Sequence, residues 1–185
     1  MTASLVALPT FGAGGRIHVV VESPRGSAVK LKYEPDLEAI VFSRPLPDGV
    51  VYPFDWGFVP STLGPDGDPV DAVVLHEVAT FPGTVIGCRP LAVLEVRQTE
   101  KGKTRRNDRL VFQPIVAEEV RDDLALTARL KRQLEQFFLS AALGTGKKLH
   151  FLGWRGAEAA HKAVVDGAKT YAEKRGAETS TRRHR

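Results

Sequence analysis

The sequence contains very little cysteine, since Cys88 is the only one among 185 residues. A single thiol excludes an internal disulfide and fits a reducing compartment. Long apolar runs are also missing, because none approaches the ~20 residues that span a bilayer. The N-terminus has no basic stretch followed by an apolar one. The sequence therefore predicts neither a secretory signal nor a membrane partner.

Motifs of several common enzyme classes are missing as well. The five histidines lack the spacing of a zinc site. The glycines between Gly12 and Gly15 are not followed by GK[ST], which excludes a phosphate-binding P-loop, and no GxSxG nucleophile elbow occurs. The aromatic residues do not alternate with the basic ones as a stacking platform would require, so we expect no nucleic-acid partner.

The composition is that of an ordinary globular protein, with 43% hydrophobic and 26% charged residues. The formal charge of +4 lies in residues 174–185, which hold five basic residues and one acidic residue. We predict an extension over residues 1–15, one domain over 16–173, and a basic tail without fixed structure over 174–185. Binding of an acidic partner by this tail is the alternative.

Strand patterns come first in the chain and helix patterns come last. Short β-branched or alternating runs are followed by turn residues, and a loop rich in Pro, Gly and Asp covers residues 45–69. The expected strands lie at 17–21, 29–33, 40–42, 70–75, 85–96 and 110–112. Asp122 or Asp123 can cap a helix that ends near Gly144, and a second helix starts near Ala157. This order predicts a β-barrel or curled sheet with helices packed on its side.

Three carboxylates, Asp66, Asp68 and Asp71, lie within one segment of six residues at the end of the expected loop. Hard divalent cations such as magnesium bind a few carboxylates together with water and phosphate oxygens. Gly67 and Pro69 could fix a loop that points these carboxylates at one place. The same residue types also make ordinary turns, so this segment alone leaves both readings open.

Charged residues of both signs gather in the first strands. Lys30, Lys32 and Glu34 have the same parity, so they project from one face of a strand. Such a face is either solvated surface or a site for an anion with a metal. Arg44 could clamp a phosphate through two hydrogen bonds or could pair with an acid. Together with the aspartates, these groups supply what phosphoryl transfer needs.

The segment DGDPVDAVV, from Asp66 to Val74, resembles the signature D-[SGDN]-D-[PE]-x-D of soluble inorganic pyrophosphatases. Further segments resemble other parts of the same family, in order along the chain. They are VVVESPRG at 19–26, LKYE at 31–34, VFSR at 41–44, VVYPFDWGFVPSTL at 50–63, VIGCRPLAVL at 85–94 and GWRGAEAA at 153–160. The chain is identified as a member of this family over residues 17–172.

The resemblance implies a mainly β fold with α-helices: a five-stranded OB-like β-barrel with two C-terminal helices. It also implies a cytoplasmic enzyme that depends on Mg2+ and forms a homo-oligomer, usually a hexamer in bacteria. Its substrate would be inorganic diphosphate, hydrolysed to two phosphates by a hydroxide held between metals.

The resemblance also implies roles for five carboxylates. Asp66 and Asp71 would bind metal, and Asp71 would bridge two metals. Asp68 would take the proton from the attacking water. Glu22 would serve a further metal through water, and Glu34 would support the site.

The expected substrate-binding residues are partly altered. Lys32 and Arg44 match family positions that hold phosphate oxygens and assist catalysis. Trp56 replaces a tyrosine and Asp55 replaces an asparagine, while Arg109 replaces a lysine and so keeps the charge with a different geometry.

Two further departures fall on metal and phosphate ligands. The family has two aspartates in the hairpin near residues 98–109; Asn107 falls at the second, or Asp108 does if the strand has a bulge. The first has no clear match, with Gln98 and Glu100 nearest. A tyrosine–lysine pair after the first helix is replaced by Ala141 and Ala142.

These departures leave three hypotheses. The chain is a divergent pyrophosphatase of reduced activity, an enzyme shifted to polyphosphate or an organic phosphoanhydride, or a non-catalytic phosphate-binding protein. In the first case, basic residues of the hairpin could replace the missing phosphate ligands. The candidates are Lys101, Lys103, Arg105 and Arg106.

Overall fold

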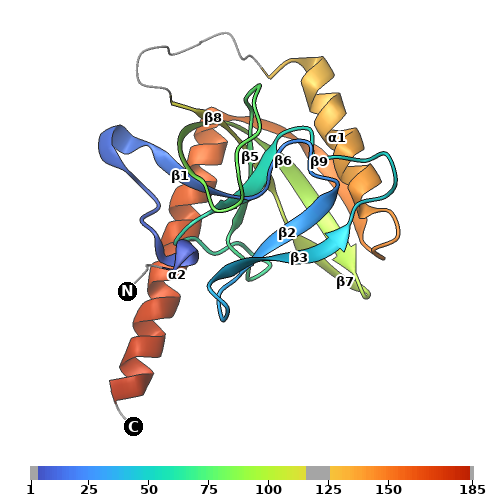
Figure 1. The fold of residues 1–185 in the computed structure, drawn as a ribbon. Helices are drawn as coiled ribbons and strands as arrows, with labels where there is room; N and C mark the ends of the chain where they lie inside the picture. Colours follow the sequence, from blue (N-terminus) through green and yellow to red (C-terminus); the bar gives the residue numbers. More distant parts are fainter. Residues whose placement is uncertain (1–3, 116–125, 184–185) are drawn as a thin grey trace.

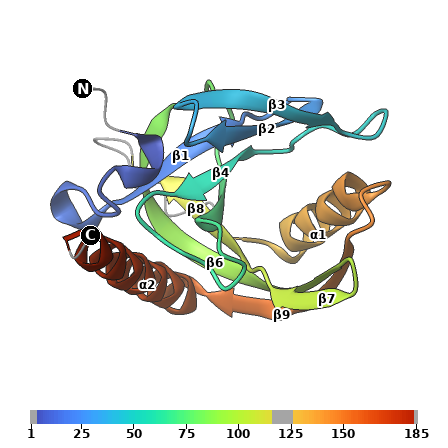
Figure 2. The same ribbon diagram turned by 90° about the horizontal axis from the view of Figure 1, so that it is seen from below.

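Five strands close into a ring in the computed structural model, which describes residues 4–115 and 126–183, with side chains up to residue 177. Neighbouring strands in the ring are β1 (Ile17–Ser23), β4 (Asp55–Val59), β5 (Val70–Val74), β8 (Arg109–Pro114) and β6 (Val85–Glu100). Pairing of β1 with β6 closes the ring. Figures 1 and 2 show the barrel from two directions. The expected five-stranded barrel is confirmed.

Side chains that alternate along the strands fill the inside of the barrel. Ile17 and Val19, Ala72 and Val74, and Leu110 and Phe112 are spaced two apart and belong to one buried cluster. This period matches the pleat of a β-strand, in which every second side chain points to the same face. The alternation in the sequence is therefore what places the core.

The remaining strands extend this barrel. The hairpin of β2 (Val29–Glu34) and β3 (Ala39–Pro45) forms a separate two-stranded sheet. The long strand β6 leaves the ring and pairs with β7 (Lys103–Arg106) and β9 (Lys148–Gly156). Because β6 takes part in both the ring and the extension, it carries the 98–107 hairpin to the edge of the barrel.

The helices lie on separate sides of the barrel (Figures 1 and 2). Helix α1 (Ala128–Ala142) is capped by the Thr127 side chain, which accepts a hydrogen bond from Leu130 N at 3.2 Å. The expected caps Asp122 and Asp123 lie outside the described residues. Phe137 and Phe138 of α1 pack with Tyr52 and Trp56 in a second buried cluster.

Helix α2 (Ala157–Arg183) buries Ala160 and Val164 against the barrel core. It continues past residue 173, so residues 174–183 are helical where we expected a tail without fixed structure. Salt bridges at helical spacing, such as Lys169–Glu173 at 4.0 Å, lie in the part of the helix before this extension. Neither α1 nor α2 has a stretch long and apolar enough to cross a membrane.

Gly57 of β4 occupies a position where a side chain has no room. A Cβ there would lie 1.8 Å from the Val20 carbonyl oxygen of the neighbouring strand. We expect Gly57→Ala to lower the free energy of unfolding by ~1–3 kcal/mol or more, since overpacking forces the backbone to shift. Thermal unfolding measures the change. Gly156→Ala is the control, because nothing lies within 4 Å of its Cβ; equal melting temperatures for the two variants would contradict the prediction.

Candidate active site

A cavity of about 450 Å³ brings acidic and basic side chains together at the open side of the barrel. Asp66, Asp68 and Asp71 line it, and so do Lys30 of β2 and Arg109 of β8. Further cations come from the β6–β7 hairpin and from the segment before β9: Lys101, Lys103, Arg105 and Lys147. A polar cavity with both signs of charge suits a multiply charged anion together with a metal ion.

The loop before β5 is a turn that also presents carboxylates. Asp68 N donates to Asp66 Oδ1 at 3.3 Å, which is the local bond of an Asx turn. Gly67 has a φ of 93°, which favours glycine. Asp71 then lies in β5, opposite Phe58 of β4. The turn reading and the site reading of this segment are thus compatible, because the turn is what aims the carboxylates.

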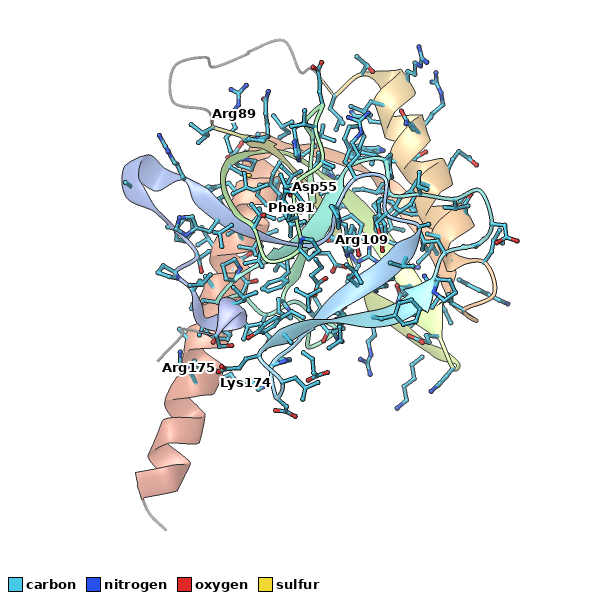
Figure 3. The ribbon with its side chains drawn as sticks, viewed as in Figure 1. Asp55, Phe81, Arg89, Arg109, Lys174 and Arg175 are labelled. Atoms are coloured by element: carbon cyan, nitrogen blue, oxygen red, sulfur yellow. The ribbon has the colours of Figure 1, made fainter. Side chains whose placement is uncertain are left out.

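Arg109 lies at the inner end of the cavity, near the middle of the molecule (Figure 3). Its Nη1 donates to Asp71 Oδ2 and to Asn107 Oδ1, and its Nη2 donates to Gln98 Oε1 at 3.3 Å. The guanidinium also lies 5.4 Å from the ring centre of Trp56 and 5.8 Å from that of Phe138. Three strands and α1 therefore position this one cation.

Burial raises the pKa of two carboxyl groups around the cavity. Burial, and then the charge of Asp71, raises the pKa of Asp66 above its ordinary range. The pKa of Glu22 is raised to about 7, mainly by burial, although Tyr33 N donates to its Oε1 at 2.7 Å. Burial also lowers the pKa of Lys30. Burial is therefore the main cause of each shift, and the charge of Asp71 adds to it at both carboxyl groups.

A second cavity of about 90 Å³ adjoins the first. It lies beside Ala141 and Ala142 at the end of α1, where the family resemblance implied a tyrosine and a lysine. Arg44 of β3 reaches across this space, and its Nη2 donates to the Ala141 carbonyl at 2.7 Å. In this position Arg44 caps the helix end as well as lining the cavity.

Lys32 and Glu34, the expected site residues of β2, lie in different surroundings. Lys32 Nζ lies 3.8 Å from Asp68 Oδ1, so the structure brings these two together. Glu34 lies at the end of β2 opposite Ala39 and is half-buried. It is not among the described residues that line either of these two cavities.

Comparison with known proteins gives a consistent result. A family model described as inorganic pyrophosphatase matches residues 19–172. The chain belongs to the inorganic pyrophosphatase family. The inorganic pyrophosphatase of Thermus thermophilus is 35% identical over 166 residues, covering 88% of this chain and 94% of the relative. The relative from Synechocystis is 32% identical, covering 90% of this chain and 98% of its own length.

Solved pyrophosphatase structures have the same fold. The crystal structure from Thermus thermophilus has a TM-score of 0.81 at 34% identity, covering 92% of this chain and 99% of that one. The enzyme from Helicobacter pylori has a TM-score of 0.76 at 29% identity, covering 90% and 97%. The OB-like barrel with two C-terminal helices is therefore that of the pyrophosphatase family.

Membership of the pyrophosphatase family implies a divalent metal, and the donors in the cavity partly fit one. Asp66, Asp68 and Asp71 supply hard oxygen ligands in one cavity. Within the described ranges, however, no three acidic, histidine or cysteine side chains are grouped closely enough to hold a metal by themselves. Water and phosphate oxygens would have to complete the coordination, which is usual for magnesium.

The two alternatives for a hairpin ligand are separated by their contacts. Asn107 lines the main cavity and bonds to Arg109. Asp108 instead accepts a hydrogen bond from Val96 N at 2.8 Å and pairs with Arg106 at 2.8 Å. Of the two, Asn107 is therefore the one that faces the cavity lined by Asp66, Asp68 and Asp71.

Asp55, at the start of β4, holds together two other segments of the chain, one at Arg25 and one at residues 76–80. It is fully buried and accepts hydrogen bonds from Arg25 N at 2.7 Å, from His76 Nε2 at 2.9 Å and from Thr80. Burial raises the pKa of Asp55, but these hydrogen bonds outweigh it and the net shift is downward. Figure 3 shows Asp55 in the barrel, above Arg109 in that view.

Lys30, which the strand parity placed on a possible anion-binding face, lines the main cavity. Sequence reasoning missed Lys147, which also lines it. Lys147 lies in a turn between α1 and β9, and no pattern in the sequence relates it to the aspartates. Arg105, from the basic hairpin, donates to the Asp66 carbonyl at 3.2 Å, so that hairpin does reach the cavity.

The raised pKa of Glu22 predicts that the stability of the metal-free protein depends on pH. Its pKa is higher in the folded state, so folding favours the protonated form and stability is lost as the pH rises from 4.5 to about 7. We expect the free energy of unfolding of the wild type, relative to Glu22→Gln, to fall by about 3 kcal/mol across this range. Denaturant unfolding in EDTA at several pH values measures it. A difference that does not change with pH would refute the assignment.

Proposed function

We propose that this chain hydrolyses inorganic diphosphate to two phosphates with Mg2+ as its cofactor. The observation that carries the proposal is the cavity in which Asp66, Asp68 and Asp71 meet several cations. Carboxylates can hold metal and accept a proton, and cations can hold phosphate oxygens. Phosphoryl transfer requires these parts and little else. Membership of the pyrophosphatase family supports diphosphate as the substrate.

Asp68 is the proposed proton acceptor. Its side chain is 65% exposed and so can reach a water molecule in the open part of the cavity. Lys32 Nζ lies 3.8 Å from its Oδ1, so a cation that could hold a phosphate oxygen stands beside the proposed base. A proton of the water passes to Asp68 while the water oxygen forms a bond to one phosphorus. The bond from that phosphorus to the bridging oxygen breaks, and the second phosphate leaves.

Asp66, Asp71 and Glu22 are the proposed metal-holding carboxylates, and Asp71 would use Oδ1 because Arg109 already donates to its Oδ2 and to Asn107 Oδ1. A bound magnesium ion would neutralise phosphate oxygens and make an attacking water more acidic. Burial, and to a smaller extent the charge of Asp71, raises the pKa of Asp66 and Glu22, and a cation bound beside them would stabilise their ionised forms. Asp108, paired with Arg106, is a weaker candidate because its oxygens already accept hydrogen bonds.

Lys32, Arg44 and Arg109 are the proposed phosphate-binding cations. Arg109 faces the cavity beside Trp56, so these two residues would form its inner wall against the diphosphate. Glu34 is proposed only as a supporting residue, because it lies at the end of β2. A homo-oligomer and a cytoplasmic location stay predictions of the resemblance.

A shifted substrate is the second candidate function, and the cavity beside Ala141 and Ala142 favours it. Alanine at both positions leaves a space of about 90 Å³ that opens next to the main cavity. A longer phosphate chain, or an organic group on a phosphoanhydride, could extend into that space. Tripolyphosphate and a nucleoside diphosphate are therefore compared with diphosphate in the same assay, and faster hydrolysis of either would favour this candidate.

Phosphate release from diphosphate at saturating Mg2+ tests the proposal. We expect turnover by the wild type and a loss of ~10²–10⁴-fold in Asp68→Ala, since a positioned base contributes about that much. Asp48→Ala is the matched control, because Asp48 is exposed and lines neither of the two cavities. Absence of turnover in the wild type, or equal turnover in both variants, would contradict diphosphate hydrolysis by this site.

A further inference from the structure

Arg109 is a buried cation whose charge is already matched inside the site. The residue is 7% exposed, and its side chain lies between the aromatic rings of Trp56 and Phe138. Removing a guanidinium from water costs several kcal/mol unless oxygen atoms replace the lost hydration. Asp71, Asn107 and Gln98 supply those oxygens. The position of this cation is therefore fixed from several sides.

The oxygens around Arg109 are of the kind that a hard divalent cation binds. One is a carboxylate oxygen and two are amide oxygens, and they come from β5, from β6 and from the turn before β8. Magnesium takes carboxylate oxygens and water, and carbonyl or amide oxygens can also bind hard cations. Here the guanidinium already uses all three. A divalent cation at the same oxygens would meet both the steric bulk and the positive charge of Arg109.

The charges of the neighbouring residues agree with this. The resemblance implies two aspartates and a lysine where this chain has Asn107, Arg109 and an unmatched position near Gln98 and Glu100. The amide at Asn107 removes one negative charge beside Arg109, and Gln98, which also contacts Arg109, is neutral. With one carboxylate and one guanidinium, the Asp71–Arg109 cluster is neutral without any metal.

We propose that the Arg109 guanidinium is a built-in cation that takes the place of one divalent metal ion beside Asp71. The chain then binds fewer metal ions per protomer than a pyrophosphatase with carboxylates in the hairpin. Metal binding remains at the outer part of the cavity, where Asp66 and Asp68 lie closer to solvent. The inference rests on the proposed metal role of these aspartates, but not on turnover of any substrate.

Counting bound Mn2+ without substrate tests this proposal, since Mn2+ takes the same oxygen ligands as Mg2+. The metal-free full chain is titrated, and free Mn2+ is followed by electron paramagnetic resonance. We expect Arg109→Met to bind about one more Mn2+ per protomer than the wild type, because Asp71 is released from its ion pair. Adding Asn107→Asp and Gln98→Asp to this variant should tighten the new site at least ~10-fold.

Arg106→Met is the matched control. Arg106 is a nearby cation of the same hairpin, but it pairs with Glu95 and Asp108 and does not line the main cavity. Its loss should leave the Mn2+ count unchanged. Circular dichroism checks the fold of each variant. If Arg109→Met does not fold, the wild type is compared with the Thermus thermophilus relative, and we expect the wild type to bind about one ion fewer.

The result that overturns the proposal is a wild-type count equal to that of the relative, or a folded Arg109→Met variant that gains no ion. Neither result depends on hydrolysis. A chain that turns over diphosphate but binds the full set of ions would refute this inference alone. A chain with the reduced count and no turnover would refute the proposed function and leave the role of Arg109 intact.

Discussion

Asp71 and Arg109 meet at the inner end of the main cavity, and their ion pair joins two neighbouring parallel strands of the barrel, β5 and β8. A charged group at this depth is stable only when its partner and its hydrogen-bond acceptors are in place. The acceptors on β6 and on the β7–β8 turn, and the rings of Trp56 and Phe138, are therefore all arranged around the guanidinium. Contacts from β4, from β6, from the β7–β8 turn and from α1 therefore meet at this one pair.

The same pair sets the electrostatics of the cavity. Asp71 contributes to raising the pKa of both Glu22 and Asp66, while burial is the larger cause in each. Arg109 balances part of that charge from the inside, and Lys32 lies beside Asp68 at the outside. The Asp71–Arg109 pair is thus neutral, while the rest of the lining places Asp66 and Asp68 among the cations of the β6–β7 hairpin. This difference between the two parts of the cavity is the physical basis for both the proposed hydrolysis and the proposed change in metal use.

Much of the fold follows from local patterns in the sequence. The alternation at Ile17 and Val19 and at Ala72 and Val74 predicts strands and their buried faces, and the order of elements predicts a barrel with helices at the end. Helix boundaries were predicted less well, because propensity alone does not say where a helix ends. Helix α2 continues to Arg183 through a segment of basic residues. Helical hydrogen bonds are local, so the helix can extend without burying that segment.

The sequence by itself determined the pyrophosphatase resemblance and the grouping of Asp66, Asp68 and Asp71, because these residues are close along the chain and a single turn brings them together. Only the tertiary structure decided which side chains face them. Asn107 contacts Arg109, whereas Asp108 accepts a hydrogen bond from Val96 N. Strand register decides which of the two faces the cavity. Arg109 lies 38 residues from Asp71, and their contact exists because β5 and β8 pair in parallel. A contact of this kind depends on how strands align across the barrel, which the order of residues along the chain does not specify.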